Sequence, residues 1–415
     1  MATLRTLKHA ACIAALIVCA ACSDSEDAAG TANAAPATSG TVPVALLSST
    51  STSTPASSPT PIPAPPQVPA KGYYVIDYTT GAVLAASNEN ERLEPASITK
   101  LMAAYGVFQA LKSGRIKLDD MVTVSAHARA QEGSRMFIEV GTRVSVEDLI
   151  QGMIVQSGND ATVALAEHVA GSEAVFVDMM NQYAQALGMT GSRFENSPGM
   201  PSPQHYMTAR DIAVLAAALV REFPEYYKWY SQRTFTWNKI TQPNRNGLLD
   251  RDPSVDGLKT GHTESAGYCL VSSGKRDGMR VISVVLGAPS IRAREDASLA
   301  LINYGFRFYE TKQLFAANKP VLTSRVWKGE VEQIELAPND DVYVTIPRGQ
   351  EASLVGTADV GHPLVAPLAR TGAAGKLRVT RGSDLVGSYD LFPVADVPPA
   401  GFFGRLWDDV MMRME

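Results

Sequence analysis

The chain has 415 residues, which is enough for two domains with separate hydrophobic cores. Apolar residues make up 45% of it and charged residues 19%, so most of the chain is expected to be globular. The formal net charge is −5 and no segment carries a basic stripe, which excludes nucleic-acid binding as a function class.

Residues 1–22 have the pattern of an export signal. Arg5 and Lys8 form a positive region, and the apolar run over 10–21 that follows is short for a bilayer span. We expect a signal peptide, with a retained N-terminal membrane helix as the alternative. The small residues before Cys22 resemble a bacterial lipoprotein signal, in which this cysteine would carry lipid, but they suit ordinary signal-peptidase cleavage equally well.

Residues 23–70 are dominated by Ser, Thr, Ala and Pro, as the run over 49–55 illustrates. Such a composition lacks the apolar residues needed to offset the entropy that folding removes. We therefore predict an extended linker between the signal and the first folded domain.

The first domain is expected to span 71–311. A hairpin is predicted over 73–85, because two β-branched or aromatic runs flank a Thr-Gly turn. Periodicity and turn residues predict the later elements: helices over 95–111, 146–154, 161–170, 212–220 and 294–309, and strands over 268–272 and 280–287. Strands, helices and then antiparallel strands favour an α/β sandwich.

Beyond this domain the helical period disappears. Short alternating runs punctuated by Gly and Pro over 312–395 predict a small β-rich domain. Residues 400–415 predict an amphipathic helix with an apolar face rich in aromatic residues. We favour a membrane-surface helix, since Pro398 and Pro399 are expected to detach it from the domain and Trp and Phe suit an interface; docking on its own domain is the alternative.

The folded part of the chain is expected to keep one of the four cysteines, Cys269, so no intramolecular disulfide framework is possible there. Cys269 lies in an apolar stretch. We predict a buried, inert thiol, with a reactive thiol as the alternative.

Three short motifs contain the candidate catalytic residues: Ser97–Lys100, Ser157–Asn159 and Lys259–Gly261. On a helix, residues three apart are neighbours, so a neutral Lys100 could take the proton of Ser97. Burial and the charge of Lys259 would lower the pKa of Lys100 as this role requires. At a helix N-terminus, Ser97 would also lend its backbone N–H to an oxyanion hole.

Each motif by itself is weak evidence for a catalytic site. A second Ser-x-x-Lys occurs at Ser272–Lys275, where we predict the end of a strand and a turn, because Gly274 would break the helix that aligns such a pair. The middle motif could cap a helix, and the third could lead from a strand into a turn. The ordered set of three is far more specific, and it indicates an acyl-transfer enzyme with an active-site serine.

The set resembles the low-molecular-mass penicillin-binding proteins that act as D-alanyl-D-alanine carboxypeptidases. The resemblance runs from about Lys71 to the C-terminus. It rests on segments 95–100, 156–161, 243–249, 255–263, 304–308 and 401–407. It implies a β-lactamase/transpeptidase-like sandwich, an antiparallel sheet with helices, followed by the β-rich domain and a membrane-anchor helix.

The resemblance also implies roles for nine residues. Ser97 would form the acyl-enzyme and Lys100 would be its base. Ser157 would relay protons to the leaving amine, Asn159 would hold the site, and Lys259 would bind substrate and set the electrostatics.

The remaining four residues would form the substrate-binding side. Thr260 and Arg294 would meet the terminal carboxylate, which needs a cationic hydrogen-bonding receptor. The backbone N–H of His262 would complete the oxyanion hole, and Arg245 is a further candidate for supporting the site. For either arginine an ordinary solvated side chain is the alternative.

The sequence thus predicts a serine D,D-carboxypeptidase that uses no metal or other cofactor, acts on peptidoglycan pentapeptides and is acylated by β-lactams. We expect it in the periplasm, attached to the inner-membrane surface through 400–415. A class A β-lactamase would need a Glu-x-x-Leu-Asn string, and this chain has no Leu-Asn pair. A D,D-endopeptidase of the same superfamily and a non-catalytic penicillin-binding scaffold are the two competing hypotheses.

Overall fold

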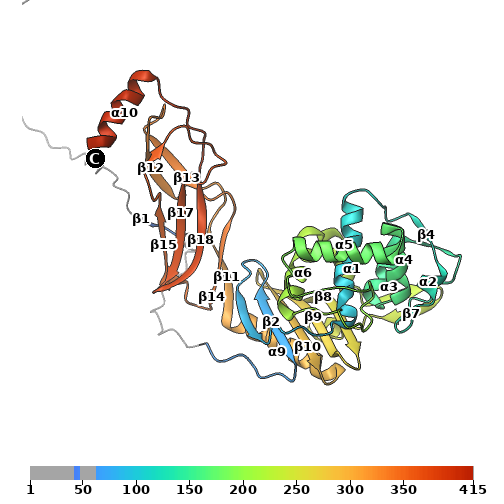
Figure 1. The fold of residues 1–415 in the computed structure, drawn as a ribbon. Coiled ribbons are helices and arrows are strands. Elements are labelled where there is room, and N and C mark those ends of the chain that lie inside the picture. Colours follow the sequence, from blue (N-terminus) through green and yellow to red (C-terminus); the bar gives the residue numbers. More distant parts are fainter. Residues whose placement is uncertain (1–41, 47–61, 415) are drawn as a thin grey trace, which may run out of the picture. The chain divides into compact units, whose positions relative to one another are not determined.

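The computed structural model describes residues 42–46 and 62–414 (Figure 1). All of these residues belong to one compact unit, residues 39–415. The predicted signal peptide over 1–22 and the lipid at Cys22 lie outside the described residues.

A five-stranded antiparallel sheet forms the centre of the first domain, with strand order β3-β2-β10-β9-β8. Its strands are β2 (Gly72–Asp77), β3 (Val83–Ser87), β8 (Val255–Thr263), β9 (Gly267–Arg276) and β10 (Met279–Ala288). Strands β2 and β3 pair as the predicted hairpin. Because β8 pairs only with β9, its other side is a free edge of this sheet.

Both faces of this sheet are covered by helices. On β10, Val281 and Val285 face a cluster that includes residues of α9 (Ile291–Phe308), while Ile282 and Val284 belong to the larger core among the other helices. Alternate side chains of a strand point to opposite faces, so a strand buried on both is apolar along its whole length.

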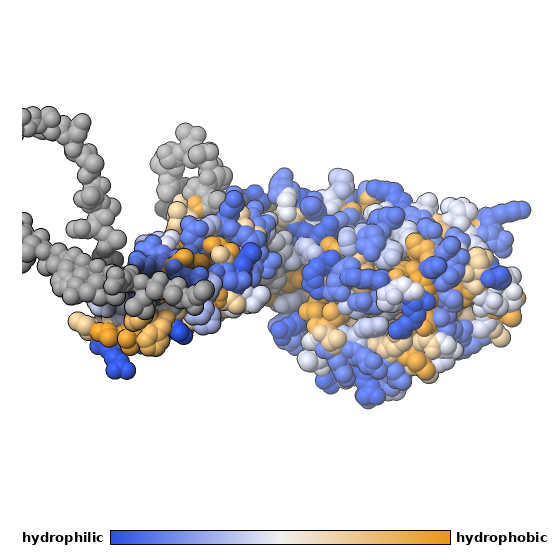
Figure 2. All heavy atoms as spheres, turned by 90° about the horizontal axis from the view of Figure 1, so that it is seen from above, coloured by the Kyte–Doolittle hydropathy of each residue, from blue (hydrophilic) through white to orange (hydrophobic). Residues whose placement is uncertain are grey.

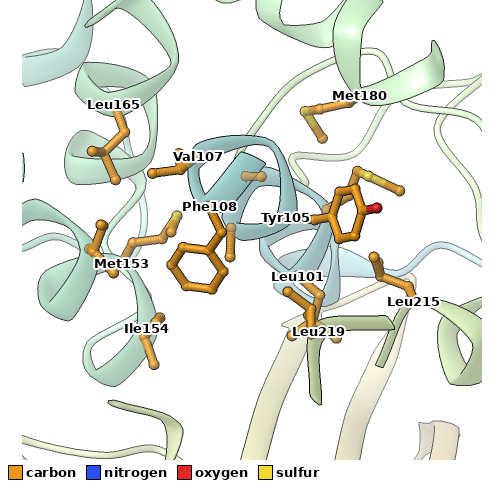
Figure 3. Close-up of a cluster of buried hydrophobic side chains, with 14 of the residues drawn as sticks. Leu101, Tyr105, Val107, Phe108, Met153, Ile154, Leu165, Met180, Leu215 and Leu219 are labelled. Carbon is orange, nitrogen blue, oxygen red and sulfur yellow. The ribbon is translucent and has the colours of Figure 1, made fainter. Parts of the chain in front are cut away.

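The helices of the larger layer surround α1 (Lys100–Lys112), which is buried on nearly every side. Figure 3 shows Phe108 and Tyr105 of α1 among side chains of α3, α4, α5 and α6. The other helices of this layer are α2 (Ala126–Arg129), α3 (Val146–Val155), α4 (Asn159–Ala170), α5 (Glu173–Ala186), α6 (Ala209–Glu222) and α7 (Pro224–Tyr227). The short helix α8 (Leu248–Arg251) belongs instead to the cluster that includes α9, through Leu248 and Leu249. Two small hairpins and two 3-10 turns complete the domain: β4 (Met121–Thr123), β5 (Arg143–Ser145), β6 (Thr234–Trp237), β7 (Ile240–Pro243), η1 (Ala96–Thr99) and η2 (Lys228–Ser231).

The C-terminal part is β-rich, with its own apolar core. Its larger sheet has the strand order β1-β15-β17-β18-β13-β12-β16, and β11 pairs with β14 separately. The elements are β1 (Val42–Val44), β11 (Tyr309–Phe315), β12 (Leu322–Trp327), β13 (Gln333–Ala337), β14 (Val342–Pro347), η3 (Glu351–Ser353), β15 (Leu354–Asp359), β16 (Leu364–Val365), β17 (Gly375–Arg381) and β18 (Asp384–Pro393). The predicted fold class, an α/β sandwich with a β-rich domain and a terminal helix, is confirmed.

Two stretches inside the predicted linker belong to the fold. Strand β1 pairs antiparallel with β15, and Val44 and Leu46 pack against the C-terminal core. Pro43 is tolerated because β1 is an edge strand. Residues 62–70 contribute Ile62 and Val68 to the core around α9. The overall Ser/Thr/Pro composition predicted an extended linker throughout, but these few apolar residues are enough to pack two short segments against the folded cores.

The terminal helix is α10 (Phe402–Met414). Its apolar side is exposed, with Phe403 at 84% and Trp407 at 67% of full accessibility, and Figure 2 shows hydrophobic atoms gathered at the end of the molecule that carries it. Its polar side is held to the domain, since Lys328 contacts Asp408 and Asp409. None of the described helices is long and apolar enough to cross a bilayer.

Three local predictions need correction. The proline pair before α10 does not detach the helix, because Pro398 accepts a hydrogen bond from Glu330 N at 3.0 Å. The second Ser-x-x-Lys lies inside β9 rather than in a turn, since Gly274 is tolerated mid-strand. The last helix of the first domain runs over Ile291–Phe308 rather than 294–309, because Ser290 caps its N-terminus.

Candidate active site

Ser97 lies in the 3-10 turn η1, and α1 begins only at Lys100. The sequence predicted one helix from residue 95. The difference arises at Ala96, whose φ of 48° is incompatible with a right-handed helix. Gly199 packs directly on this turn, since a Cβ there would collide with the carbonyl oxygen of Ala96. The turn that presents Ser97 is therefore held by tertiary contact.

Lys100 is buried and its Nζ has three partners. It lies 3.0 Å from Ser97 Oγ, 2.7 Å from Asn159 Oδ1 and 2.7 Å from the carbonyl oxygen of Pro198. A charged ammonium would donate one N–H to each. A neutral amine would still donate two N–H groups to Asn159 and Pro198, and its lone pair would then face the Ser97 hydroxyl.

The surroundings of Lys100 favour the neutral amine. Burial and the positive charge of Arg245 lower the pKa of Lys100 to about 7, and the carboxylate of Asp160 opposes this shift. A pKa near neutrality leaves a substantial fraction of Lys100 able to accept a proton at physiological pH.

Ser157 and Lys259 meet from distant parts of the chain. Ser157 lies between α3 and α4 with a φ of 65°, and its Oγ accepts a hydrogen bond from Lys259 Nζ at 2.9 Å. Lys259 is on β8 and also donates to the carbonyl oxygen of Thr260 at 2.9 Å. Burial, followed by the charges of Lys100 and two arginines, lowers the pKa of Lys259 well below its usual value.

Asn159, the first residue of α4, connects the motifs. Its Oδ1 accepts from Lys100, and its Nδ2 donates to the carbonyl oxygen of Glu132 at 2.6 Å. The neighbouring Asp160 is fully buried and accepts backbone hydrogen bonds from Met136 and Phe137 at 2.8 Å each. The 131–138 segment is thereby fastened to the start of α4.

A cleft of about 710 Å³ opens above these residues. Seven of the nine predicted site residues line it: Ser97, Ser157, Asn159, Arg245, Thr260, His262 and Arg294. The other two, Lys100 and Lys259, are buried beneath it in contact with Ser97 and Ser157. None of the described residues that line the cleft is acidic, so no carboxylate among them would repel a bound anion.

Arg294 is the buried cation of the cleft. It is only 5% exposed, makes two long hydrogen bonds of 3.4 Å to the carbonyl oxygens of Gly261 and Arg245, and leaves its Nε without a partner. The solvated alternative for Arg294 is therefore wrong. Arg245 itself is exposed at the edge of the cleft.

The His262 side chain is exposed and stacks on Tyr268 with ring centroids 4.1 Å apart. It reaches neither Ser97 nor Ser157 by a hydrogen bond in the described structure. This agrees with a backbone rather than a general-base role for His262. Since it lies on the edge strand β8, its backbone can serve the cleft.

Cys269 is buried in β9 and is the free cysteine among the described residues. The predicted burial of Cys269 is confirmed, and burial raises the pKa of its thiol to about 11, which keeps the thiol protonated near pH 7. The described residues contain no group of three or more His, Cys, Asp or Glu side chains that could hold a metal ion.

Several contacts in and around the site could not be predicted from residue types. The carbonyl oxygens of Pro198 and Glu132 hold Lys100 and Asn159, but a backbone group has no signature in residue type. His205 Nε2 lies 2.8 Å from Thr99 Oγ1, and burial lowers the pKa of His205 to about 4, so the ring is neutral near pH 7. A histidine far from every motif in the sequence gave no sign of this contact.

The family of the chain follows from comparison with known proteins. A family model described as D-alanyl-D-alanine carboxypeptidase matches residues 59–290, and a model of the penicillin-binding protein 5 C-terminal domain matches residues 309–399. The chain belongs to the D-alanyl-D-alanine carboxypeptidase family. The predicted class, a serine-type peptidase hydrolase among the penicillin-binding proteins, is confirmed.

Relatives of this carboxypeptidase family match along most of the chain. D-alanyl-D-alanine carboxypeptidase DacC of Escherichia coli K12 is 44% identical over 356 residues, which are 84% of this chain and 89% of the relative. The structure of penicillin-binding protein 5 from Haemophilus influenzae has a TM-score of 0.78 and 42% identity, covering 81% of this chain and 99% of that one. Penicillin-binding protein D2 from Listeria monocytogenes, in an ampicillin-bound form, has a TM-score of 0.54 and 30% identity over 58% of this chain and 98% of its own.

Proposed function

We propose that this protein removes the terminal D-alanine from peptidoglycan pentapeptides through an acyl-enzyme on Ser97. The observation that carries this proposal is the 3.0 Å contact between Lys100 Nζ and Ser97 Oγ, in a setting that lowers the pKa of Lys100 to about 7. Ser97 Oγ attacks the carbonyl carbon of the penultimate D-alanine while Lys100 takes its proton.

Release of D-alanine then requires a proton on the leaving nitrogen. Ser157 is the donor we propose, because its Oγ lines the cleft and accepts a hydrogen bond from Lys259 Nζ at 2.9 Å. It passes its proton to the leaving nitrogen as it takes one from the Lys259 ammonium group. The peptide C–N bond breaks, D-alanine leaves as an amine, and a water molecule later hydrolyses the ester on Ser97. Asn159 keeps Lys100 aligned through these steps.

The substrate ends in a carboxylate, and the cleft suits one. Arg294 has a free, buried Nε, Thr260 offers a hydroxyl, and Arg245 adds a second positive charge at the edge. A charge-assisted hydrogen bond of this kind is about twice as strong as a neutral one. The backbone N–H groups of Ser97 and His262 are the proposed oxyanion hole.

The test of this function measures D-alanine release from a pentapeptide that ends in D-Ala-D-Ala, together with the site of labelling by a penicillin. We expect release that prior treatment with penicillin abolishes, and one adduct on the peptide that contains Ser97. Cleavage of cross-linked dimers without D-alanine release would favour the endopeptidase. Labelling without either cleavage would favour the non-catalytic scaffold.

We also propose that the protein works in the periplasm, bound to the inner-membrane surface through α10. The exposed aromatic face of α10 and the side chains of Asp408 and Asp409 turned toward Lys328 support this. Pairing with Lys328 offsets the acidic charge that anionic lipid would repel, so burial of the apolar face can dominate binding.

Membrane binding through α10 is expected to depend on this apolar face. Co-sedimentation with vesicles of phosphatidylethanolamine and phosphatidylglycerol should fall about tenfold or more for Trp407→Glu, since an exposed ring of this size loses the burial that drives insertion. Leu385→Glu is the matched control, because Leu385 is 60% exposed on β18. Equal loss in both variants, or no loss in Trp407→Glu, would contradict the proposal.

A further inference from the structure

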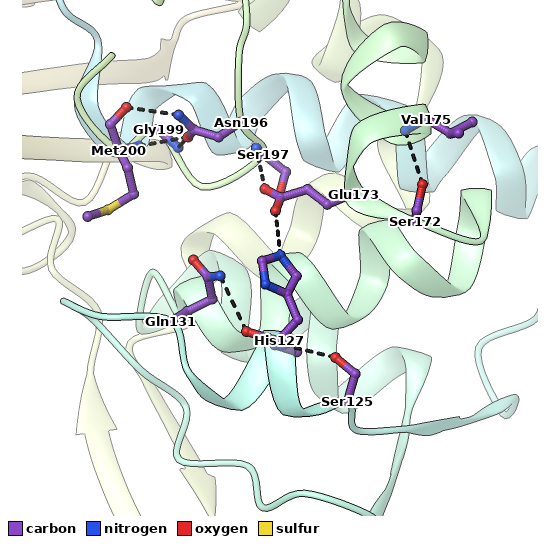
Figure 4. A network of polar contacts seen from close by, with 11 residues as sticks. Ser125, His127, Gln131, Ser172, Glu173, Val175, Asn196, Ser197, Gly199 and Met200 are labelled. Carbon is purple, nitrogen blue, oxygen red and sulfur yellow. Dashed lines mark hydrogen bonds and ion pairs between the residues drawn. The ribbon is translucent and has the colours of Figure 1, made fainter.

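Glu173, the first residue of α5, joins two segments that meet at the active site (Figure 4). Its Oε1 accepts hydrogen bonds from Ser197 N at 2.9 Å and Ser197 Oγ at 2.8 Å. Its Oε2 accepts one from His127 Nε2 at 2.9 Å. The Glu173 side chain is only 17% exposed and Ser197 is fully buried, so the Ser197 contacts are shielded from water, whereas the His127 side chain is 56% exposed.

The Ser197 contact leads directly to Lys100. Ser197 is fully buried, and the carbonyl oxygen of the next residue, Pro198, is the one that accepts from Lys100 Nζ at 2.7 Å. The loop beyond it is tightly turned, because Asn196 Oδ1 accepts from both Gly199 N and Met200 N at 2.8 Å. A shift of Ser197 would therefore move the Pro198 carbonyl.

The His127 contact leads to Asn159. His127 lies on α2, and Gln131 Nε2 donates to its carbonyl oxygen at 3.3 Å. The next residue, Glu132, supplies the carbonyl oxygen that accepts from Asn159 Nδ2 at 2.6 Å. Asn159 N also donates to Ser134 O at 2.7 Å, so the same segment holds both ends of this residue.

We propose that Glu173 is a positioning residue for acylation, which ties together the two segments whose carbonyl groups hold Lys100 and Asn159. This inference rests on the proposed function of Ser97 and Lys100. One carboxylate receives hydrogen bonds from both segments, so the separation of the two carbonyl groups depends on it. Misplacement of reacting groups by about 1 Å can cost about 100-fold in rate.

The pH profile of acylation reports this positioning. A carbonyl oxygen stabilises the ammonium form of Lys100, so withdrawal of the Pro198 carbonyl lowers the pKa of Lys100 further. The other groups facing Lys100 are Lys259 on β8, Arg245, Asp160 on α4 and the neutral ring of His205. None of these contacts Glu173 by a hydrogen bond that the structure describes, so substitution at Glu173 leaves them in place.

The experiment measures the second-order rate of acylation by a fluorescent penicillin as a function of pH, using the full chain. For Glu173→Ala we expect a plateau rate reduced about 10- to 100-fold and a midpoint displaced to lower pH. Glu173→Gln keeps an acceptor for both Ser197 donors, and its rate and midpoint should stay close to those of the unchanged protein.

Controls separate positioning from stability. Asp178→Ala removes an exposed carboxylate from the same helix and should change neither the rate nor the midpoint. Ser197→Ala removes one of the two Ser197 donors and should shift the midpoint in the same direction by less, which keeps the test available if Glu173→Ala does not fold. An unchanged or higher midpoint in Glu173→Ala, or a Gln variant as slow as the Ala variant, overturns the inference.

This inference and the proposed function fail in different ways. Penicillin acylation depends on Ser97 and Lys100 but not on the natural substrate. Normal acylation by penicillin without D-alanine release would therefore contradict the proposed function, and the role of Glu173 could still be tested. Normal D-alanine release together with an unshifted pH profile of acylation in Glu173→Ala would contradict only the positioning role.

Discussion

Replacing Ser97 with alanine is expected to abolish both D-alanine release and covalent labelling by a β-lactam, with a loss of at least about 10⁴-fold in kcat/KM. The reason is chemical, because no other hydroxyl contacts Lys100 Nζ in the described structure. The Ser157 hydroxyl contacts Lys259 instead. D-alanine release and the mass of the penicillin-treated protein measure the two losses.

The second Ser-x-x-Lys of the chain supplies a matched control. Ser272 is fully buried in β9 and its Oγ has no hydrogen-bond partner, so Ser272→Ala leaves no donor or acceptor unpaired. We expect Ser272→Ala to retain full activity and labelling. If Ser97→Ala still released D-alanine at an appreciable rate while remaining folded, Ser97 would not be the nucleophile.

Replacing Lys100 is expected to lower the acylation rate by about 10²–10⁴-fold, the usual contribution of a general base. Lys100→Arg should not restore the acylation rate, because a guanidinium remains protonated and cannot accept the Ser97 proton. Lys100→Met should be equally slow, because its side chain has no basic group. Lys275→Met, at the exposed lysine of the second Ser-x-x-Lys, should behave like the unchanged protein.

The same lysine predicts the pH dependence. Only neutral Lys100 can accept the Ser97 proton, and the pKa of Lys100 is lowered to about 7. The acylation rate should therefore rise as the pH passes through about 7 and level off above it. Stopped-flow acylation from pH 5 to pH 9, at constant ionic strength, measures this midpoint. A profile that stays flat from pH 5 to pH 9, or a rate that still rises at pH 9, would contradict a Lys100 base with a pKa near 7.

Much of the fold could be predicted from the sequence because its causes are local. The hairpin β2–β3 is encoded in two β-branched runs and a turn, and the helices α3, α4 and α6 in apolar periodicity and capping residues. The ends of the helices were predicted less accurately than their central turns. At Ser97 the sequence suggested a helix start, whereas packing of Gly199 against Ala96 imposes a separate 3-10 turn.

The sequence by itself determined the reacting groups of this protein, because side-chain chemistry depends on residue type and three ordered motifs define it. Ser97 and Lys100 are also neighbours by spacing alone. Tertiary structure alone decided how they are held. The carbonyl groups of Pro198 and Glu132 reach the site through chain folding, and Glu173 joins their segments across long sequence separations. Backbone groups are the same in every residue, so no pattern of residue types could reveal which of them would hold the catalytic lysine.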